Sequence, residues 1–119
     1  MPLNPEAVRD MAERYAKAWS SHVAQDIASF YEPDGYIIIN DGEPSVGHAG
    51  LAAMAQGFID GFPDLVLTVD AVRSAGNRAV MMWTLEGTNS GPGGSGHAVK
   101  FSGWEAWHLS DDLKVIASD

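Results

Sequence analysis

A carboxyl group predicted to point into an apolar interior is the strongest chemical signal in the sequence. Glu105 alternates with Phe101, Gly103 and Trp107 along a strand predicted over His97–Leu109, and alternate residues of a strand share one face. An unpaired carboxyl group in apolar surroundings has a raised pKa, which suits a general acid or base near neutral pH. A bulge at Gly103 would instead turn Glu105 outward as an ordinary surface charge.

Two neutral polar residues are candidates to act beside Glu105. Tyr15 lies on the apolar face of the first predicted helix, where a buried phenol must find either a ligand oxygen or a core carbonyl. Asn40 follows the first predicted strand, and an inward amide there would bind a substrate carbonyl or hydroxyl. The sequence Asn40-Asp41-Gly42 also fits an ordinary turn, so both interpretations stay open.

Other familiar site patterns are missing or occur in the wrong context. The chain has four His and no Cys, and no His pair has the spacing of a zinc site, so we expect no metal. The serines lack the G-x-S-x-G elbow of serine hydrolases. Gly91–Gly96 formally contains G-x-G-x-x-G, but a strand follows it where a dinucleotide site needs a helix. We therefore expect a hairpin loop there.

The candidate residues depend on an order of elements predicted from hydrophobic periodicity and turn signals. Helices are expected from Asn4-Pro5, over 24–31 and around 51–59. Strands are expected over 36–39, 65–74, 78–88, 97–109 and 113–118. The order α-α-β-α-β-β-β-β predicts an α+β fold, with helices covering one face of a curved antiparallel sheet. We expect one domain over residues 1–119, whose last strand is short for its partner and is a candidate for truncation.

The apolar face of this sheet must meet the helices, and large side chains from both would share one interior. The sequence leaves open whether they fill it or line a pocket. The candidate ligand-binding residues are Trp19, Phe30, Met54, Phe58, Met81, Trp83, Phe101 and Trp107.

Composition excludes several classes of partner. Seven Lys and Arg against sixteen Asp and Glu give a formal charge of −9, which disfavours nucleic acid and anionic membrane surfaces. No apolar stretch approaches the roughly 20 residues of a membrane helix. The N-terminus has no basic region or apolar run, so we expect no signal peptide and a cytoplasmic location.

The order of elements and several short motifs resemble one family over essentially the whole chain. The chain looks like the SnoaL-like polyketide cyclase and ketosteroid isomerase group of the nuclear transport factor 2-like superfamily. The motifs that carry the resemblance are Phe30-Tyr31-Glu32-Pro33-Asp34-Gly35, Val46-Gly47, Gly57-Phe58, Phe62-Pro63-Asp64-Leu65, 83–91 and 99–103.

This resemblance implies a cone-shaped α+β half-barrel with an apolar pocket, commonly dimeric through the sheet, and chemistry without a cofactor. Tyr15 resembles the tyrosine that donates to the developing enolate in the isomerases. Glu105 resembles their second oxyanion-hole acid, which is an Asp, and ketosteroid isomerase is a known example of such an acid kept protonated by an apolar site. The isomerase base is replaced here by Ile39 or Asn40, and Asp119 is the candidate for the acid that the cyclases place on the last strand.

Three functions remain open at this stage. The first is acid–base catalysis on a small hydrophobic carbonyl or epoxide compound, by isomerisation, cyclisation or hydrolysis. The second is a non-catalytic module that binds a small hydrophobic ligand. The third is a structural or assembly domain whose pocket is filled by its own side chains. A pocket of roughly 300 Å³ or more that contains Glu105 favours the first two.

Overall fold

A computed structural model describes residues 3–119. The expectation of an N-terminus without a signal peptide rests partly on residues 1–2, which lie outside the described residues. Helix α1 (Pro5–Ser21) begins as predicted, because the Asn4 side chain accepts a hydrogen bond from the Glu6 amide. Its predicted apolar face is buried, as is Tyr15 within it.

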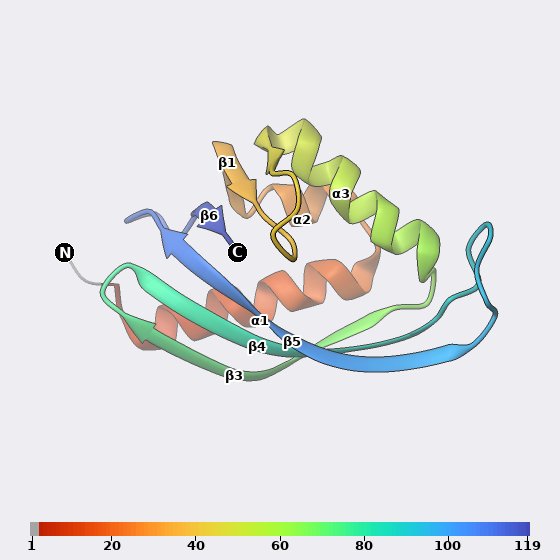
Figure 1. Cartoon of the computed structure of the whole chain (residues 1–119). Helices are drawn as coiled ribbons and strands as arrows, with labels where there is room; N and C mark the ends of the chain where they lie inside the picture. Colours follow the sequence, from red (N-terminus) through yellow and green to blue (C-terminus); the bar gives the residue numbers. More distant parts are fainter. Residues whose placement is uncertain (1–2) are drawn as a thin grey trace.

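Helices cover one face of a curved six-stranded sheet, so the predicted α+β class is confirmed (Figure 1). The long strands β3, β4 and β5 curve beneath α1, and α2, α3, β1 and β6 lie above it. After α1 the elements are α2 (Ala24–Ala28), β1 (Tyr31–Ile37), β2 (Ser45–Val46), α3 (Gly47–Gly61), β3 (Val66–Ala75), β4 (Arg78–Thr88), β5 (Ala98–Leu109) and β6 (Val115–Ser118).

The short strand β6 joins the two halves of the chain. The strand order is β2-β1-β6-β5-β4-β3, in which β6 pairs antiparallel with β5 and parallel with β1. Strands β3, β4 and β5 form the predicted antiparallel meander. Because β6 lies between β1 and β5, it places β1 beside the C-terminal end of β5, with Tyr31 and Leu109 both paired with Val115.

The region around β1 corrects the predicted elements. The second helix ends at Ala28 rather than reaching Tyr31, and β1 begins at Tyr31 rather than Tyr36. On β6, Tyr31 pairs with Val115 and Tyr36 with Ala117, so β1 bulges between its two tyrosines. Turn-forming residues Pro33-Asp34-Gly35 lie between the helix predicted over 24–31 and the strand predicted over 36–39, but in the structure they form a bulge inside a strand.

The remaining differences are small. Strand β2 was not predicted, and α3 begins at Gly47, ahead of its apolar repeat. The strand predicted over 78–88 is found with those bounds, and β3 and β5 shift by one residue. Strand β6 begins at Val115 rather than Leu113, because Leu113 turns with a positive φ of 61°.

We predict that Gly35→Ala destabilises the fold. A Cβ atom at Gly35 would lie 2.6 Å from the Val115 carbonyl oxygen, so β1 would have to move away from β6. The expected loss in the free energy of unfolding is about 1–3 kcal/mol, measured by urea denaturation. Gly57→Ala is the matched control, because a Cβ there meets nothing within 4 Å and alanine favours the helix. Equal stability of the two variants would contradict the close approach of β1 and β6.

Candidate functional site

A cavity of about 540 Å³ lies on the concave side of the sheet. Such a volume falls within the range of about 300–1,000 Å³ that is typical of small-molecule sites. Its lining comes from α1, α3, the sheet and the segment that follows β1. The walls are mainly apolar and include Trp19, Ile37, Met54, Phe58, Leu67, Trp83, Leu85 and Phe101.

Two pairs of aromatic rings meet edge-on in these walls. The ring centroids of Trp19 and Phe58 lie 5.9 Å apart, and those of Trp83 and Phe101 lie 6.0 Å apart. Gly103 makes room for Trp83, since a Cβ at Gly103 would lie 2.7 Å from the indole. The glycine therefore lets a large ring cross the neighbouring strand and form part of the wall.

Glu105 lies in the wall of the cavity, as the alternation along β5 predicts. Strands β4 and β5 pair in unbroken register from Arg78 opposite His108 to Thr88 opposite Ala98. A bulge at Gly103 is therefore absent, and Glu105 shares the inner face with its buried partner Met81.

Three side chains hold the Glu105 carboxyl group from behind the cavity wall. The indole Nε1 of Trp107 donates to Glu105 Oε2. The Tyr15 hydroxyl lies 3.3 Å from Oε1, and the Tyr31 hydroxyl lies 3.4 Å from Oε2. The two hydroxyl oxygens are themselves 2.9 Å apart. The carboxyl group is thus fixed in position by donors from α1, β1 and β5.

The surroundings shift the pKa values of this cluster upward. Burial raises the pKa of Glu105 above its ordinary value, and the neighbouring donor groups, Trp107 first among them, oppose that rise. Burial, followed by the charge of Glu105, raises the pKa values of Tyr15 and Tyr31 well above the ordinary value. Both phenols therefore keep their protons at neutral pH and act as hydrogen-bond donors.

Four of the predicted site residues do not line the cavity. Tyr15 is fully buried, and its hydroxyl faces Glu105 rather than the cavity. The Phe30 ring packs against Tyr15 with centroids 5.4 Å apart. Met81 and Trp107 are buried in the sheet around Glu105. These side chains support the carboxyl group, whereas Trp19, Met54, Phe58, Trp83 and Phe101 form the walls.

Polar side chains gather where β1 ends. Asn40 and Asp41 line the cavity and are exposed, with positive φ values of 50° and 59°. The Gly42 amide donates to the Ile39 carbonyl, so the predicted turn and the predicted lining position of Asn40 occur together. Asp119 also lines the cavity and adds a second exposed carboxylate to its lining.

Tyr31 is a site residue that sequence reasoning missed. It is the last residue of the helix predicted over 24–31, but in the structure it begins β1 and its hydroxyl contacts both Tyr15 and Glu105. The rule that a buried phenol needs a partner was applied to Tyr15 and would have marked Tyr31 as well.

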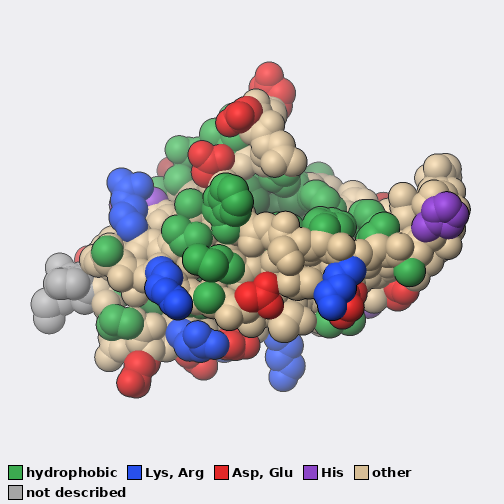
Figure 2. All heavy atoms as spheres, turned by 60° about the horizontal axis from the view of Figure 1, so that its bottom comes forward, with side chains coloured by type: hydrophobic (Ala, Val, Ile, Leu, Met, Phe, Trp, Pro, Cys, Tyr) green, Lys and Arg blue, Asp and Glu red, His purple; other side chains and the backbone are tan. Residues whose placement is uncertain are grey.

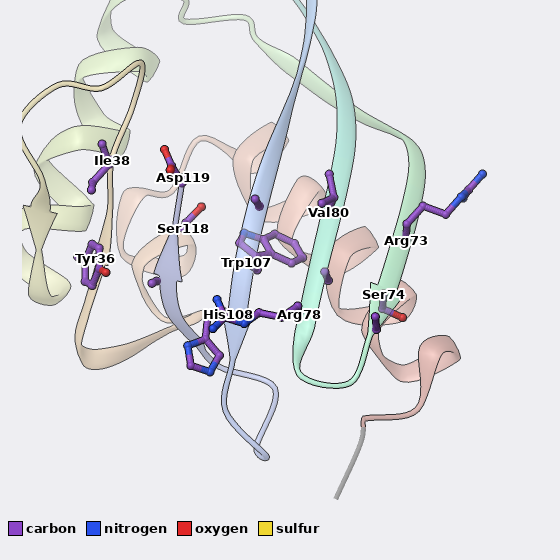
Figure 3. A pocket seen from close by; sticks show the side chains of 14 residues that line it. Tyr36, Ile38, Arg73, Ser74, Arg78, Val80, Trp107, His108, Ser118 and Asp119 are labelled. Atoms are coloured by element: carbon purple, nitrogen blue, oxygen red, sulfur yellow. The ribbon is translucent and has the colours of Figure 1, made fainter.

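A second hollow, of about 590 Å³, lies on the outer face of the sheet (Figure 3). Arg73, Arg78, His108 and Tyr36 stand around it, and small side chains such as Ala106 form its floor. On β5 the hollow is lined by Trp107 and by Ala106 and His108, and strand alternation points the last two away from Glu105. Ile38 and Asp119 line both the hollow and the cavity.

Among residues 3–119, no group of three or more His, Asp or Glu side chains is arranged to hold a metal ion. None of the helices in the same range is both long enough and apolar enough to cross a membrane.

Comparison with solved structures places the fold. AclR, a candidate hydroxylase from Streptomyces galilaeus, is 22% identical with a TM-score of 0.81, over 97% of this chain and 87% of AclR. A candidate SnoaL-like polyketide cyclase from a Jannaschia species is 20% identical with a TM-score of 0.85, over 99% of this chain and 88% of the other. At these identities the likeness is one of fold.

A third structure, from Catenulispora acidiphila, has a ketosteroid isomerase-like fold and was solved in complex with trimethylamine. It is 11% identical with a TM-score of 0.81, over 92% of this chain and 82% of the other. No curated protein matches the sequence. The sequence model of the SnoaL-like domain matches residues 12–117, in agreement with the curved sheet, its helical cover and the resemblance found in the sequence. The chain belongs to the SnoaL-like domain family.

Proposed function

We propose that this protein catalyses proton transfer on a small, largely apolar carbonyl compound, with Glu105 as the proton carrier. The observation that carries the proposal is the position of the Glu105 carboxyl group. It lies in the wall of an apolar cavity, on three donors that approach from the opposite side. A general acid or base needs both access to the substrate and a pKa near the working pH, and the burial of Glu105 favours the second condition.

The proposed step moves a proton and no electrons. The Glu105 carboxylate accepts a proton from the carbon next to the substrate carbonyl, which leaves an enolate. The resulting carboxylic acid returns the proton to another carbon, which completes an isomerisation and restores the starting enzyme. Asn40, a neutral amide at the mouth of the cavity, would donate to the enolate oxygen. Tyr15 and Tyr31 are positioning residues, because their hydroxyls contact Glu105 and not the cavity. The step requires no cofactor.

The lining of the cavity also restricts the substrate. Its ionisable side chains are Asp41, Glu105 and Asp119, and among residues 3–119 no Lys, Arg or His lines it. An anionic substrate would meet carboxylates without a countercharge, so we expect a neutral or cationic molecule. The names of the similar structures, a polyketide cyclase and a hydroxylase among them, agree with a small organic substrate. Fold likeness alone does not establish a reaction.

A binding module without catalysis is the second candidate. The resemblance puts Ile39 or Asn40 where the isomerases have their base, and neither side chain can accept the substrate proton. In that case the same cavity would hold a small hydrophobic ligand with Glu105 as a hydrogen-bonding group. The open volume of about 540 Å³ argues against the third possibility, a domain filled by its own side chains.

We also propose a homodimer formed through the outer face of the sheet, where hydrophobic groups lie among charged ones (Figure 2). Trp104 is 69% exposed and Met82 is 39% exposed, and the two residues are register partners on that face. Arg78 and Glu86 lie toward opposite ends of the same face of β4. If two copies pack these faces together about a two-fold axis perpendicular to the strands, Arg78 lies against Glu86 of the partner subunit. The charges of the face therefore complement those of a second copy.

We predict that Glu105→Gln lowers turnover by about 10²–10⁴-fold, the usual contribution of a general acid or base. Deuterium exchange next to the carbonyl, followed by NMR on a panel of small cyclic ketones, measures this step directly. Glu43→Gln is the matched control, because Glu43 is exposed and lies outside the cavity. Wild-type exchange in Glu105→Gln would remove Glu105 from the mechanism. Retained ligand binding in that variant would then support the binding module.

The stability of the wild type relative to Glu105→Gln should depend on pH. The pKa of Glu105 is raised in the folded state, so folding binds a proton between the unfolded and folded pKa values. The contribution of Glu105 to the free energy of unfolding is therefore fully present below its pKa in the unfolded chain, near 4.3. This contribution is lost as pH rises through the pKa of Glu105 in the folded state. The loss is at most about 1.4 kcal/mol per pH unit. Urea denaturation of both proteins from pH 4 to 8 measures it, and a constant difference would contradict the buried carboxyl group.

Sedimentation velocity tests the dimer. We expect a dimer of the 12.7 kDa chain at micromolar concentration, and Arg78→Glu should weaken it through like-charge repulsion with Glu86 of the partner subunit. Adding Glu86→Arg should restore it, because the reversed pair attracts again. A monomeric wild type at that concentration, or an Arg78→Glu variant that dimerises as tightly as wild type, would overturn the proposed interface.

A further inference from the structure

One buried hydroxyl group beside Glu105 lacks a hydrogen-bond partner. Ser118 is 1% exposed, and among residues 3–119 its Oγ is the buried side-chain oxygen that makes no hydrogen bond. Buried polar groups are nearly always paired, and leaving one unpaired costs stability. An orphaned hydroxyl next to a candidate catalytic carboxyl therefore requires an explanation.

The location of Ser118 follows from the pairing of β6. Ser118 is the register partner of Trp107 on β5 and of Ile37 on β1, and both partners are buried on the inner face. Figure 3 shows Ser118 and Trp107 on these neighbouring strands. Glu105 lies two residues before Trp107 on the same face of β5, so Ser118 and Glu105 are diagonal neighbours across the β5–β6 pair. In agreement with this placement, the Ser118 hydroxyl lowers the pKa values of Glu105 and Tyr31, although it makes no hydrogen bond with either.

A count of donor protons shows what Ser118 can add. An ionised carboxylate has about four sites that accept hydrogen bonds. Trp107 supplies one proton. Tyr15 and Tyr31 are bonded to each other, so while that bond persists one of their two protons is used within the pair and the other reaches Glu105. The ionised carboxylate therefore has room for a further donor, and the Ser118 hydroxyl is adjacent and free.

We propose that Ser118 is a positioning residue whose hydroxyl turns to Glu105 when the carboxyl group ionises, completing the hydrogen-bond shell of the base form. The inference rests on the proposed function, in which Glu105 alternates between carboxylate and acid during one turnover. In the acid form the Ser118 hydroxyl stays unpaired, which favours ionisation. In the base form it donates a charge-assisted bond, the stronger kind of hydrogen bond. Ser118 thereby reduces the free-energy difference between the protonated and the ionised form of Glu105.

The other groups around Glu105 do not replace this donor. Tyr15 approaches from α1, Tyr31 from β1 and Trp107 from β5 itself, while its β4 partner Met81 has no ionisable group. Asp41 and Asp119 share the cavity as carboxylates and accept rather than donate hydrogen bonds. Ser118 can be exchanged without altering any of these groups, so its contribution can be measured by itself.

NMR titration of protein labelled with ¹³C at the glutamate side-chain carboxyl carbon tests the proposal without any substrate. The Glu105 signal is identified by its absence in Glu105→Gln. In Ser118→Ala, the Glu105 midpoint should rise by about one pH unit, the value of a hydrogen bond to a charged group. Ser118→Thr keeps the hydroxyl and should retain the wild-type midpoint. Ser102→Ala is the control, because the Ser102 hydroxyl bonds to Thr84 rather than to Glu105.

An unchanged or lowered midpoint in folded Ser118→Ala would overturn the proposal. If the alanine variant does not fold, Ser118→Cys gives the same test, because a thiol of similar size is a weak donor and should also raise the midpoint. A role in packing alone would leave every midpoint unchanged, whatever happens to stability. Failure of this proposal can be distinguished from failure of the proposed function, since exchange on ketones in Glu105→Gln tests catalysis and this titration tests the donor.

Discussion

The constraint on which the rest of the structure depends is the burial of one carboxyl group, that of Glu105, against the apolar interior of the curved sheet. Burying a carboxyl group without partners is costly, and here the cost is offset by the Trp107 indole and the Tyr15 and Tyr31 hydroxyls. The result is asymmetric, because the donors occupy the protein side of the carboxyl group and leave its other side to the cavity. Because of that asymmetry, the Glu105 carboxyl group is held by the protein on one side and can contact a bound molecule on the other.

The donors come from three elements that only the sheet can bring together. Tyr15 is placed by α1, Trp107 by β5, and Tyr31 by the parallel pairing of β1 with β6. That pairing needs the bulge in β1 and the close approach of Gly35 to the Val115 carbonyl. Backbone contacts remote from the cavity thus determine whether the second tyrosine reaches the carboxyl group. They also determine where Ser118 lies relative to Glu105.

The sequence predicted those parts of the molecule that have a clear period. Alternation along β5 placed Glu105 on the inner face, and helical spacing placed Tyr15 in the core. It missed Tyr31 in β1, because a turn signal at Pro33-Asp34-Gly35 has the same composition whether it precedes a strand or bulges within one. It also placed Trp107 in the wall of the pocket. The alternation of residues along β5 points both Glu105 and Trp107 inward. It does not predict that Glu105 reaches the cavity while Trp107 supports it. No local pattern marks Ser118, whose role depends on partners distant in the chain.

The central claim is that Glu105 holds a proton at a pH where exposed carboxyl groups have lost theirs, while facing an apolar cavity. Infrared difference spectra of wild type against Glu105→Gln, recorded through a pH titration, measure this directly. We expect a protonated carboxyl band that is absent from the variant and that disappears at a higher pH than the exposed carboxyl groups titrate, in keeping with the raised pKa of Glu105. A Glu105 band that titrates together with the exposed carboxyl groups would contradict the account.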